Sequence, residues 1–231
     1  MFFDTRIGEG DMFLNGIPKG KHIFPGYSNL LKKAGVTLER EHPAALTAKL
    51  RGKTWEAESL LLSSERMLML LARGVIQAGV IGDDKLRESG ADVETRFELC
   101  NEALGLPETR IVLFAGENDP AQKLDDIPEY STILTEYERL TKRFFEGAGL
   151  TVQTTFVNRG VEAEVPRLRR FGVALVDSGA TLKANRLKEI CTITTARPVF
   201  AVSKIAATTP EQYAEINCFA RLLQDAVQVR T

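Results

Sequence analysis

The sequence predicts an α/β protein with two lobes and mostly parallel sheets. Apolar, β-branched runs alternate with stretches of helical period, the pattern typical of strands joined by crossover helices. The length of 231 residues suits one large domain or two small ones, and an apolar content of 44% can form a sizeable core. A polar, turn-rich stretch at residues 105–130 indicates a hinge or connecting loop between the lobes.

Strands are expected where short apolar runs end at turn-forming residues. These segments are residues 74–82, 110–116, 131–135, 151–157, 172–176 and 198–203. Residues 136–147 predict a helix, because Tyr137, Leu140 and Phe144 recur at helical spacing. Gly147 follows, where such a helix would end. Residues 210–228 predict a second amphipathic helix, whose apolar side packs on a core.

The charge balance excludes several classes of protein. Thirty Lys and Arg against 31 Asp and Glu give a net charge of −1, which provides no global basic field for nucleic acid or an anionic membrane. The apolar runs are far shorter than the roughly 18 residues of a membrane span. Asp4, Glu9 and Asp11 precede any apolar run, unlike in a secretory signal. We therefore expect a cytoplasmic protein without nucleic-acid or membrane partners.

Cysteine and histidine are too few and too scattered for a zinc site or a disulfide framework. The chain contains Cys100, Cys191, Cys218, His22 and His42. Nothing in their spacing supports a Cys–His nucleophile pair.

The most informative stretch is Asp177-Ser-Gly-Ala-Thr-Leu182, into which the apolar strand 172–176 runs directly. Consecutive backbone N–H groups together with Ser and Thr hydroxyls suit a phosphate monoester, and Gly179 permits close approach of a ligand. The carboxylate of Asp177 suits sugar hydroxyls, so the combination favours a phosphorylated sugar. An ordinary strand-ending turn has the same composition, and spacing alone leaves both interpretations open.

Six segments resemble one family in the family's own order along the chain. Gly179-Ala-Thr-Leu-Lys-Ala-Asn-Arg-Leu-Lys-Glu-Ile190 resembles the phosphoribosyl-pyrophosphate loop of the histidine-biosynthetic ATP phosphoribosyltransferases. The other segments are Ile17-Pro-Lys-Gly-Lys21, Leu30-Leu-Lys-Lys-Ala-Gly35, Gly79-Val-Ile-Gly-Asp-Asp84 with Glu88-Ser-Gly-Ala-Asp-Val93, Thr135-Glu-Tyr137 with Arg143-Phe-Phe145, and Gly160-Val-Glu162. Because these matches are collinear, the chain is identified as a divergent, short-form member of that family.

The resemblance implies two lobes around a cleft, similar to type II periplasmic binding proteins. Lobe I would comprise residues 1–108 and 196–231, and lobe II residues 109–195 with the phosphoribosyl-pyrophosphate loop. The implied reaction transfers 5-phosphoribosyl from phosphoribosyl pyrophosphate to N1 of ATP, with Mg²⁺ as cofactor and pyrophosphate as leaving group. About 30 residues follow the strand 198–203, too few for a built-in regulatory domain. The expected partner is therefore a regulatory subunit similar to histidyl-tRNA synthetase, in a homo- or hetero-oligomer.

The resemblance also implies roles for individual residues. A highly charged leaving group and an oxocarbenium-like transition state require cations and a metal. The expected catalytic residues are Glu162, Lys19 and Asp177, and Asp177 is also the candidate metal ligand. Phosphoribosyl pyrophosphate would contact Asp177, Ser178, Gly179, Ala180, Thr181, Leu182, Lys21 and Lys32. The acceptor would contact Gly82, Asp84, Tyr137 and Arg66.

The sequence departs from the family pattern at several of these positions. Ala174 and Ser63 stand where the family has an Asp and an Arg, Ile81 replaces a Thr, and Asn185-Arg186 replaces Asn-Gly. Glu164 is an alternative to Glu162 as the aligned carboxylate. Two alternatives for the function therefore remain open. One is a phosphoribosyltransferase for another nitrogen heterocycle, and the other is a non-catalytic ligand-binding or regulatory member of the family.

Overall fold

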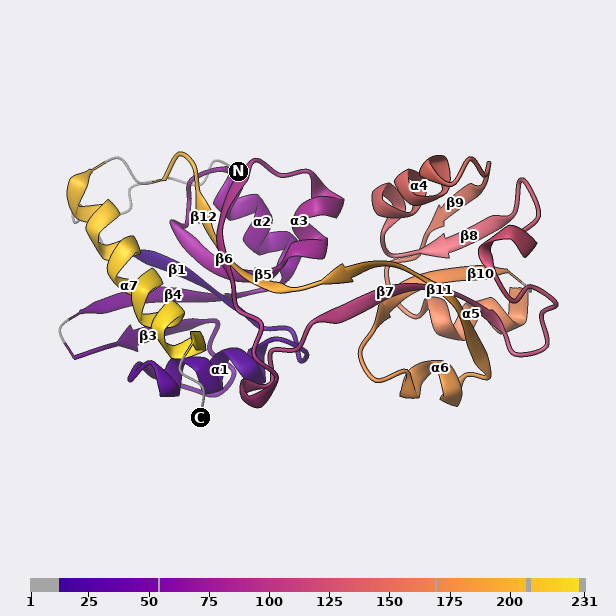
Figure 1. Cartoon of the computed structure of the whole chain (residues 1–231). Helices are drawn as coiled ribbons and strands as arrows, with labels where there is room; N and C mark the ends of the chain where they lie inside the picture. Colours follow the sequence, from indigo (N-terminus) through magenta and orange to yellow (C-terminus); the bar gives the residue numbers. More distant parts are fainter. Residues whose placement is uncertain (1–12, 54, 169, 207–208, 229–231) are drawn as a thin grey trace. The chain divides into compact units, whose positions relative to one another are not determined.

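The computed structural model describes residues 13–53, 55–168, 170–206 and 209–228, and the chain forms two compact units (Figure 1). Unit 1 comprises residues 1–81, 91–106 and 198–231, and unit 2 comprises residues 82–90 and 107–197. Each unit is built on one sheet, which confirms the α/β class with two lobes. Residues 82–90, assigned by sequence to lobe I, belong to unit 2.

Unit 1 contains a seven-stranded sheet in the order β2-β3-β4-β1-β5-β12-β6. The strands are β1 (Leu14–Pro18), β2 (Thr37–Glu39), β3 (Thr47–Arg51), β4 (Glu56–Leu62), β5 (Ala78–Gly82), β6 (Val93–Glu98) and β12 (Pro198–Ser203). The helices are α1 (Phe24–Lys33), α2 (Ser64–Ala72) and α7 (Pro210–Gln228), with a 3₁₀ turn at Glu102–Leu104. Strand β1 pairs in parallel with β4 and β5, so the carboxyl ends of these strands meet at one edge.

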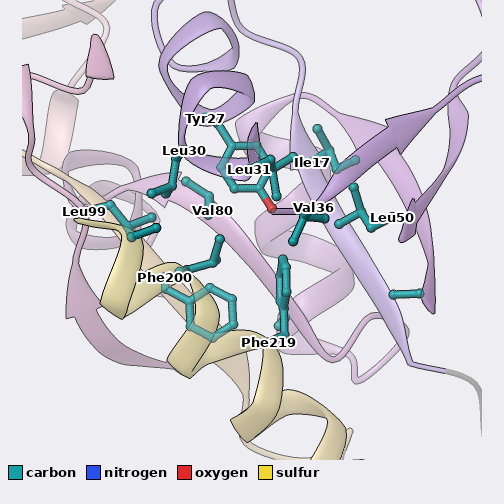
Figure 2. Packing of buried hydrophobic residues seen from close by; sticks show 14 of the residues in the cluster. Ile17, Tyr27, Leu30, Leu31, Val36, Leu50, Val80, Leu99, Phe200 and Phe219 are labelled. Carbon is teal, nitrogen blue, oxygen red and sulfur yellow. The ribbon is translucent and has the colours of Figure 1, made fainter. Parts of the chain in front are cut away.

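Helices α1 and α7 contribute to one buried apolar cluster with the strands of this sheet (Figure 2). Tyr27 of α1 and Phe219 of α7 are fully buried, and the ring of Phe219 lies 5.8 Å from that of Phe200 in an edge-to-face arrangement. Burying an aromatic side chain of this kind contributes about 1.5–3 kcal/mol. The sequence-predicted helix 210–228 is confirmed, because its apolar residues form the packing side.

Helix α2 approaches the sheet at two glycines. A Cβ on Gly79 would lie 2.8 Å from the sulfur of Met67, and one on Gly16 would lie 3.1 Å from its terminal methyl. Glycine at these two strand positions therefore makes room for Met67 of α2.

Unit 2 contains a five-stranded sheet in the order β11-β7-β10-β8-β9. The strands are β7 (Thr109–Gly116), β8 (Thr132–Thr135), β9 (Gln153–Phe156), β10 (Phe171–Val176) and β11 (Leu187–Ala196). The helices are α3 (Asp83–Ser89), α4 (Glu138–Gly147), α5 (Val161–Leu168) and α6 (Ala180–Ala184), with a 3₁₀ turn at Leu124–Asp126. Strands β10, β8 and β9 run parallel, whereas β7 is antiparallel to both β10 and β11.

Both sheets are thus mixed, with parallel pairing confined to β4-β1-β5 and β10-β8-β9 among the strand pairs described. The expected strands near 110, 131, 151, 172 and 198 form within about two residues of their predicted ends. Residues 74–77 precede β5 rather than joining it. Most of the segment 105–130, expected to connect the lobes, lies inside unit 2 and includes β7. Turn-forming residues occur in every surface loop, so they do not distinguish a connection between lobes from a loop within one lobe. No helix within the described ranges combines the length and apolarity needed to cross a membrane.

Candidate functional site

The turn after β10 is exposed at the carboxyl end of the parallel strands in unit 2. Strand β10 is buried up to Val176, whereas Asp177, Ser178 and Ala180 are exposed. The carboxylate of Asp177 has no hydrogen-bond or ion-pair partner among the described residues. Ligands of open α/β sheets bind at this edge, so the predicted phosphoribosyl-pyrophosphate loop occupies the expected position.

Gly179 gives this turn its shape. Its φ of 72° lies in the left-handed region that favours glycine, and it begins helix α6. A Cβ there would meet no atom within 4 Å, so backbone conformation rather than crowding requires glycine. Leu182 is 4% exposed and anchors α6 in a buried cluster. The first N–H groups of a helix lack partners within it, and the Ala180 N–H donates to the Ser178 hydroxyl at 3.5 Å. The exposed hydroxyl of Thr181 and the N–H groups of this turn are of the kind that binds phosphate oxygens.

Arg186, which stands where the resemblance implies a glycine, has a left-handed backbone conformation. Its φ is 52°, and its carbonyl accepts a hydrogen bond from the amide of Glu117 at 2.8 Å. The left-handed conformation costs a non-glycine residue roughly 1–2 kcal/mol. The turn between α6 and β11 therefore carries backbone strain at Arg186.

Helix α5 presents two carboxylates in its first turn. Val161 and Val165 are buried and orient the helix, while Glu162 is half-buried and Glu164 is exposed. Glu162 also interacts electrostatically with Glu136. Of the two candidates, Glu162 is the less exposed and the one whose charge acts on Glu136.

Glu136 is a member of this edge that the sequence analysis missed. It follows β8 and is half-buried. Burial raises the pKa of Glu136 above its ordinary value. The charge of Lys85 lowers this pKa, that of Glu162 raises it, and that of Arg159 lowers it. Sequence analysis could have grouped Glu136 with Asp177 only by predicting that β8 and β10 are neighbouring parallel strands, because residues that follow such strands lie at the same edge of the sheet.

Asp84 and Tyr137, expected to contact the acceptor, are paired with each other. The Tyr137 hydroxyl donates to the Asp84 carboxylate at 2.8 Å, and the residues are 1% and 4% exposed. Burial raises the pKa of Asp84 and that of Tyr137. Gly82 is also buried. The buried pair of Asp84 and Tyr137 fits a role in fixing α3 better than direct contact with the acceptor. The ammonium of Lys85, also on α3, lies over the Tyr137 ring, 4.1 Å from its centroid.

Helix α3 is attached to the rest of unit 2 by its acidic residues. Glu88 accepts hydrogen bonds from the backbone N–H groups of Arg139 at 2.9 Å and Leu140 at 3.0 Å, which caps α4. Asp83 accepts one from the amide of Arg197 at 2.7 Å. These contacts explain why residues 82–90 belong to unit 2.

In unit 1, Lys19 and Lys21 lie in the turn after β1 and are exposed. The amide of Lys19 donates to the carbonyl of Leu62 at 2.9 Å, which places Lys19 beside the end of β4. Ser63 follows β4 and caps α2, with its hydroxyl accepting from the amide of Arg66 at 3.4 Å. Arg66 is exposed in the first turn of α2. Lys19, Ser63 and the start of α2 therefore share the carboxyl edge of this sheet.

Lys32 does not share that turn. It lies in the last turn of α1, eight residues beyond Phe24, which is about 12 Å along the helix at a rise of 1.5 Å per residue. A cation at a helix carboxyl terminus is stabilised by the helix dipole. Lys32 therefore lies at the far end of α1 from the turn that carries Lys19 and Lys21.

Two of the family departures are core positions in this chain. Ala174 is 3% exposed and packs in a cluster with Val161 and Leu182, which orients α5 and α6. Ile81 is 1% exposed at the end of β5.

The carboxylates of the site can be compared with the ligands that Mg²⁺ requires. No group of three or more Asp, Glu, His or Cys side chains suited to a metal occurs in the part of the chain that the structure describes. Mg²⁺ commonly binds through one or two carboxylates plus substrate phosphates, and keeps waters. The exposed carboxylate of Asp177 fits that mode, so the residues suit a metal that arrives with the pyrophosphate.

Comparisons with known proteins agree on one family. The family model HisG, described as ATP phosphoribosyltransferase, matches residues 64–225. An ATP phosphoribosyltransferase of Geotalea uraniireducens is 30% identical over 216 residues, covering 92% of this chain and 72% of that protein. One from Halothermothrix orenii is 28% identical over 196 residues, covering 84% of this chain and 85% of that protein.

Solved structures show the same fold. The chain resembles one from an ATP phosphoribosyl transferase (HisG:HisZ) complex of Thermotoga maritima, with a TM-score of 0.73, 24% identity and coverage of 94% and 99% of the two chains. It also resembles the substrate binding protein of an amino acid ABC transporter, with a TM-score of 0.56, 14% identity and coverage of 94% and 93%. The expected similarity to periplasmic binding proteins is therefore confirmed at the level of fold.

Proposed function

The chain belongs to the ATP phosphoribosyltransferase family, and we propose how its own residues perform the reaction of that family. It transfers the 5-phosphoribosyl group of phosphoribosyl pyrophosphate to N1 of ATP and releases pyrophosphate, the first step of histidine biosynthesis. The observation that carries the site is the exposed turn after β10, with its left-handed Gly179 at the start of α6.

In this proposal the turn binds the phosphorylated sugar. The N–H groups at the start of α6 and the hydroxyls of Ser178 and Thr181 hold the 5-phosphate. Leu182 contributes through its backbone, because its side chain is buried. Asp177 accepts hydrogen bonds from ribose hydroxyls or holds the metal.

The chemical step breaks the bond between ribose C1 and the pyrophosphate oxygen and forms a bond between C1 and N1 of ATP. Lys19 and Lys21 stabilise the charge that develops on the leaving pyrophosphate. Mg²⁺, when bound, neutralises part of the pyrophosphate charge, and Asp177 is the residue that would hold it. Glu162 orients the sugar or the base, and Arg66 binds the acceptor.

A partner subunit is part of the proposal. The Thermotoga maritima structure is of a HisG:HisZ complex, and the present chain has the same fold. We propose that this chain likewise assembles with a regulatory subunit similar to histidyl-tRNA synthetase. Its substrate ATP is a cytoplasmic metabolite, so we also propose a cytoplasmic location.

The test is to incubate the chain, alone and with such a subunit, with ATP and phosphoribosyl pyrophosphate. Release of pyrophosphate together with a phosphoribosyl-ATP product detected by mass spectrometry is the expected result. No product in either preparation would contradict the proposal.

The loop assignment has a separate test in Thr181→Val. This change removes one hydroxyl from the phosphate site and should weaken phosphoribosyl-pyrophosphate binding by roughly fivefold to tenfold, the loss of one hydrogen bond. Thr181→Ser is the matched control, because it keeps the hydroxyl and should bind like the wild type. Equal affinity of Thr181→Val and the wild type would contradict the loop assignment.

A second candidate is a phosphoribosyltransferase for another nitrogen heterocycle. Ser63 serves as a helix cap and Ala174 as a core residue, so neither supplies the charged group that the family carries there. Bases and nucleotides assayed in parallel with phosphoribosyl pyrophosphate decide between the two. One acceptor with a kcat/KM clearly above that of ATP favours this candidate, and a clear preference for ATP excludes it. Turnover with any acceptor excludes a purely non-catalytic role.

A further inference from the structure

We propose that Lys85 is a substrate-binding residue of unit 2, whose ammonium, held over the ring of Tyr137, donates to a phosphate oxygen of a bound substrate. The inference rests on the proposed function, in which both ATP and phosphoribosyl pyrophosphate carry several phosphate groups. It adds a cation to the edge that carries the turn at residues 177–182.

The ring of Tyr137 brings Lys85 to the end of β8. Strand β8 ends at Thr135, whose hydroxyl accepts a hydrogen bond from the amide of Tyr137 at 2.8 Å. The Tyr137 side chain is therefore fixed just beyond the strand, and the residue is 1% exposed. The ammonium of Lys85 lies 4.1 Å from the centroid of its ring. A lysine carried by α3 thus lies at the carboxyl end of β8.

This strand end belongs to the same edge as the proposed phosphate turn. Strands β8 and β10 pair in parallel, with Thr135 opposite Val173. Strand β10 ends at Val176, and Asp177 begins the turn. Neighbouring strands of a sheet lie about 4.8 Å apart. Phosphate-rich substrates bound at this edge therefore meet the ammonium of Lys85 on the strand next to the turn.

Helix α3, which carries Lys85, is held in place on both sides of this residue. Asp84 accepts from the Tyr137 hydroxyl at 2.8 Å, and Glu88 accepts from two backbone amides of α4. Lys85 is half-buried between these anchors. A side chain that is already held in one place loses less conformational freedom when it binds an anion.

The ammonium of Lys85 keeps hydrogen-bond donors available. A lysine has three N–H donors, and Lys85 makes no hydrogen bond and no ion pair in the part of the chain that the structure describes. The Tyr137 ring attracts the cation through the electrostatic field of its face. The N–H donors of Lys85 are therefore available for phosphate oxygens.

Glu136 is the carboxylate that competes for Lys85 at this edge. The charge of Lys85 lowers the pKa of Glu136, and the charge of Arg159 also lowers it. Glu136 is thus balanced by two cations, and Arg159 remains when Lys85 binds a substrate. A phosphate group carries up to about two negative charges and three acceptor oxygens. It therefore attracts the ammonium more strongly than a single carboxylate does.

The test is titration calorimetry of the full chain and of Lys85→Met with ATP, phosphoribosyl pyrophosphate and inorganic pyrophosphate, each with Mg²⁺. Methionine keeps an unbranched side chain but removes the charge. We expect affinity to fall about tenfold for one of the two substrates, the loss of one hydrogen bond to a charged group. A fall for ATP alone identifies its triphosphate as the ligand, and a fall for phosphoribosyl pyrophosphate and pyrophosphate identifies the leaving group. Unchanged affinity for all three ligands would overturn the proposal.

Lys123→Met is the matched control, because it makes the same change of charge in unit 2. Lys123 is exposed and pairs with Asp125 at 3.2 Å. Its neighbour Asp126 lines a pocket with Thr132 and Phe171, the first residues of β8 and β10, so Lys123 lies toward the opposite edge of the sheet. Its affinities should equal those of the wild type. Equal losses in Lys123→Met and Lys85→Met would overturn the proposal, because net charge alone would then explain them.

Stability and kinetics separate substrate binding from a structural role of Lys85. In Lys85→Met the KM of the substrate identified by calorimetry should rise about tenfold, while the KM of the other changes less than about twofold. A lower free energy of unfolding in urea with unchanged affinities would assign Lys85 a structural role and overturn the proposal. If Lys85→Met does not fold, Lys85→Gln is measured in its place with the same expectation.

The proposed function and the role of Lys85 can fail separately. A wild-type chain that binds both substrates without forming product contradicts the proposed function, and the calorimetric comparison still decides the role of Lys85. A wild-type chain that binds none of the three ligands contradicts both.

Discussion

The carboxyl edges of the two sheets are built in different ways. In unit 1, Lys19 and Lys21 lie on the short turn after β1, and Ser63 caps helix α2. In unit 2, Asp177 follows β10 and Glu136 follows β8, and the two residues share one edge because β10 and β8 pair in parallel. Local sequence therefore groups the two lysines of the first edge, whereas strand order brings together the carboxylates of the second edge.

The largest effect is a loss of kcat/KM that should occur on substitution of Lys19 but not on substitution of Lys32. Lys19→Met should lower kcat/KM for phosphoribosyl pyrophosphate about tenfold to a hundredfold, because a hydrogen bond to a charged group contributes about 1.5–3 kcal/mol. Lys32→Met, at the other end of α1, should remain within about twofold of the wild type. Steady-state kinetics of both variants checks this. A comparable loss in Lys32→Met would place the far end of α1 in the site.

The next effect concerns Gly179. Gly179→Ala should lower the free energy of unfolding by about 1–2 kcal/mol, because alanine is disfavoured at positive φ. Affinity for phosphoribosyl pyrophosphate should fall as well, since a relaxed turn no longer aligns its N–H groups. Urea unfolding and calorimetric titration measure the two quantities. The control is Gly147→Ala, where the added methyl also meets open space but φ is not positive, so no loss is expected.

A smaller effect of opposite sign is expected at Arg186. Arg186→Gly should raise the free energy of unfolding by about 0.5–1 kcal/mol, because relief of the left-handed strain exceeds the added chain entropy of glycine. Lys183→Gly, inside α6, should instead destabilise by about 1 kcal/mol. Urea unfolding curves of the two variants distinguish them. If Arg186→Gly destabilises the protein, the arginine side chain stabilises the fold by more free energy than the left-handed backbone conformation costs.

The smallest effect is a pH dependence at Asp84. Burial raises its pKa in the folded state, so its contribution to stability is full below the unfolded value of about 3.9 and is lost as pH rises through the folded pKa. Asp84→Asn does not titrate, so its stability relative to the wild type should improve as pH rises above about 4. Tyr137→Phe removes the hydroxyl whose hydrogen bond lowers the pKa of Asp84. In this variant, which keeps Asp84, the free energy of unfolding should therefore depend more strongly on pH than in the wild type. Urea unfolding across this pH range measures both differences. A constant difference between wild type and Asp84→Asn would contradict the shifted pKa.

Much of the fold and part of the site could be predicted from the sequence. The strand before Asp177 and the helix at residues 210–228 have strong apolar periodicity, and both form as expected. The left-handed conformation at Gly179 agrees with the choice of glycine in the predicted phosphate turn. Strands β1, β2, β3, β4, β6 and β11 lie outside the segments that the sequence predicts as strands. In β11 the polar and apolar residues alternate irregularly and continue from a helical segment.

Other parts of the site could not be predicted because they depend on long-range pairing. The motif containing Asp84 and the one containing Tyr137 were both interpreted as acceptor contacts, yet the two side chains are buried against each other. Spacing along the chain does not reveal such a pair, which lies 53 residues apart.

The sequence by itself determined the α/β class, the family and the turn at residues 177–182, because these depend on local composition and short motifs. The tertiary structure decided that Asp177 and Glu136 share one edge of unit 2, that Lys32 lies in the last turn of α1, and that residues 82–90 belong to unit 2. The physical reason is strand register and helix length, which set distances between residues that no local pattern connects.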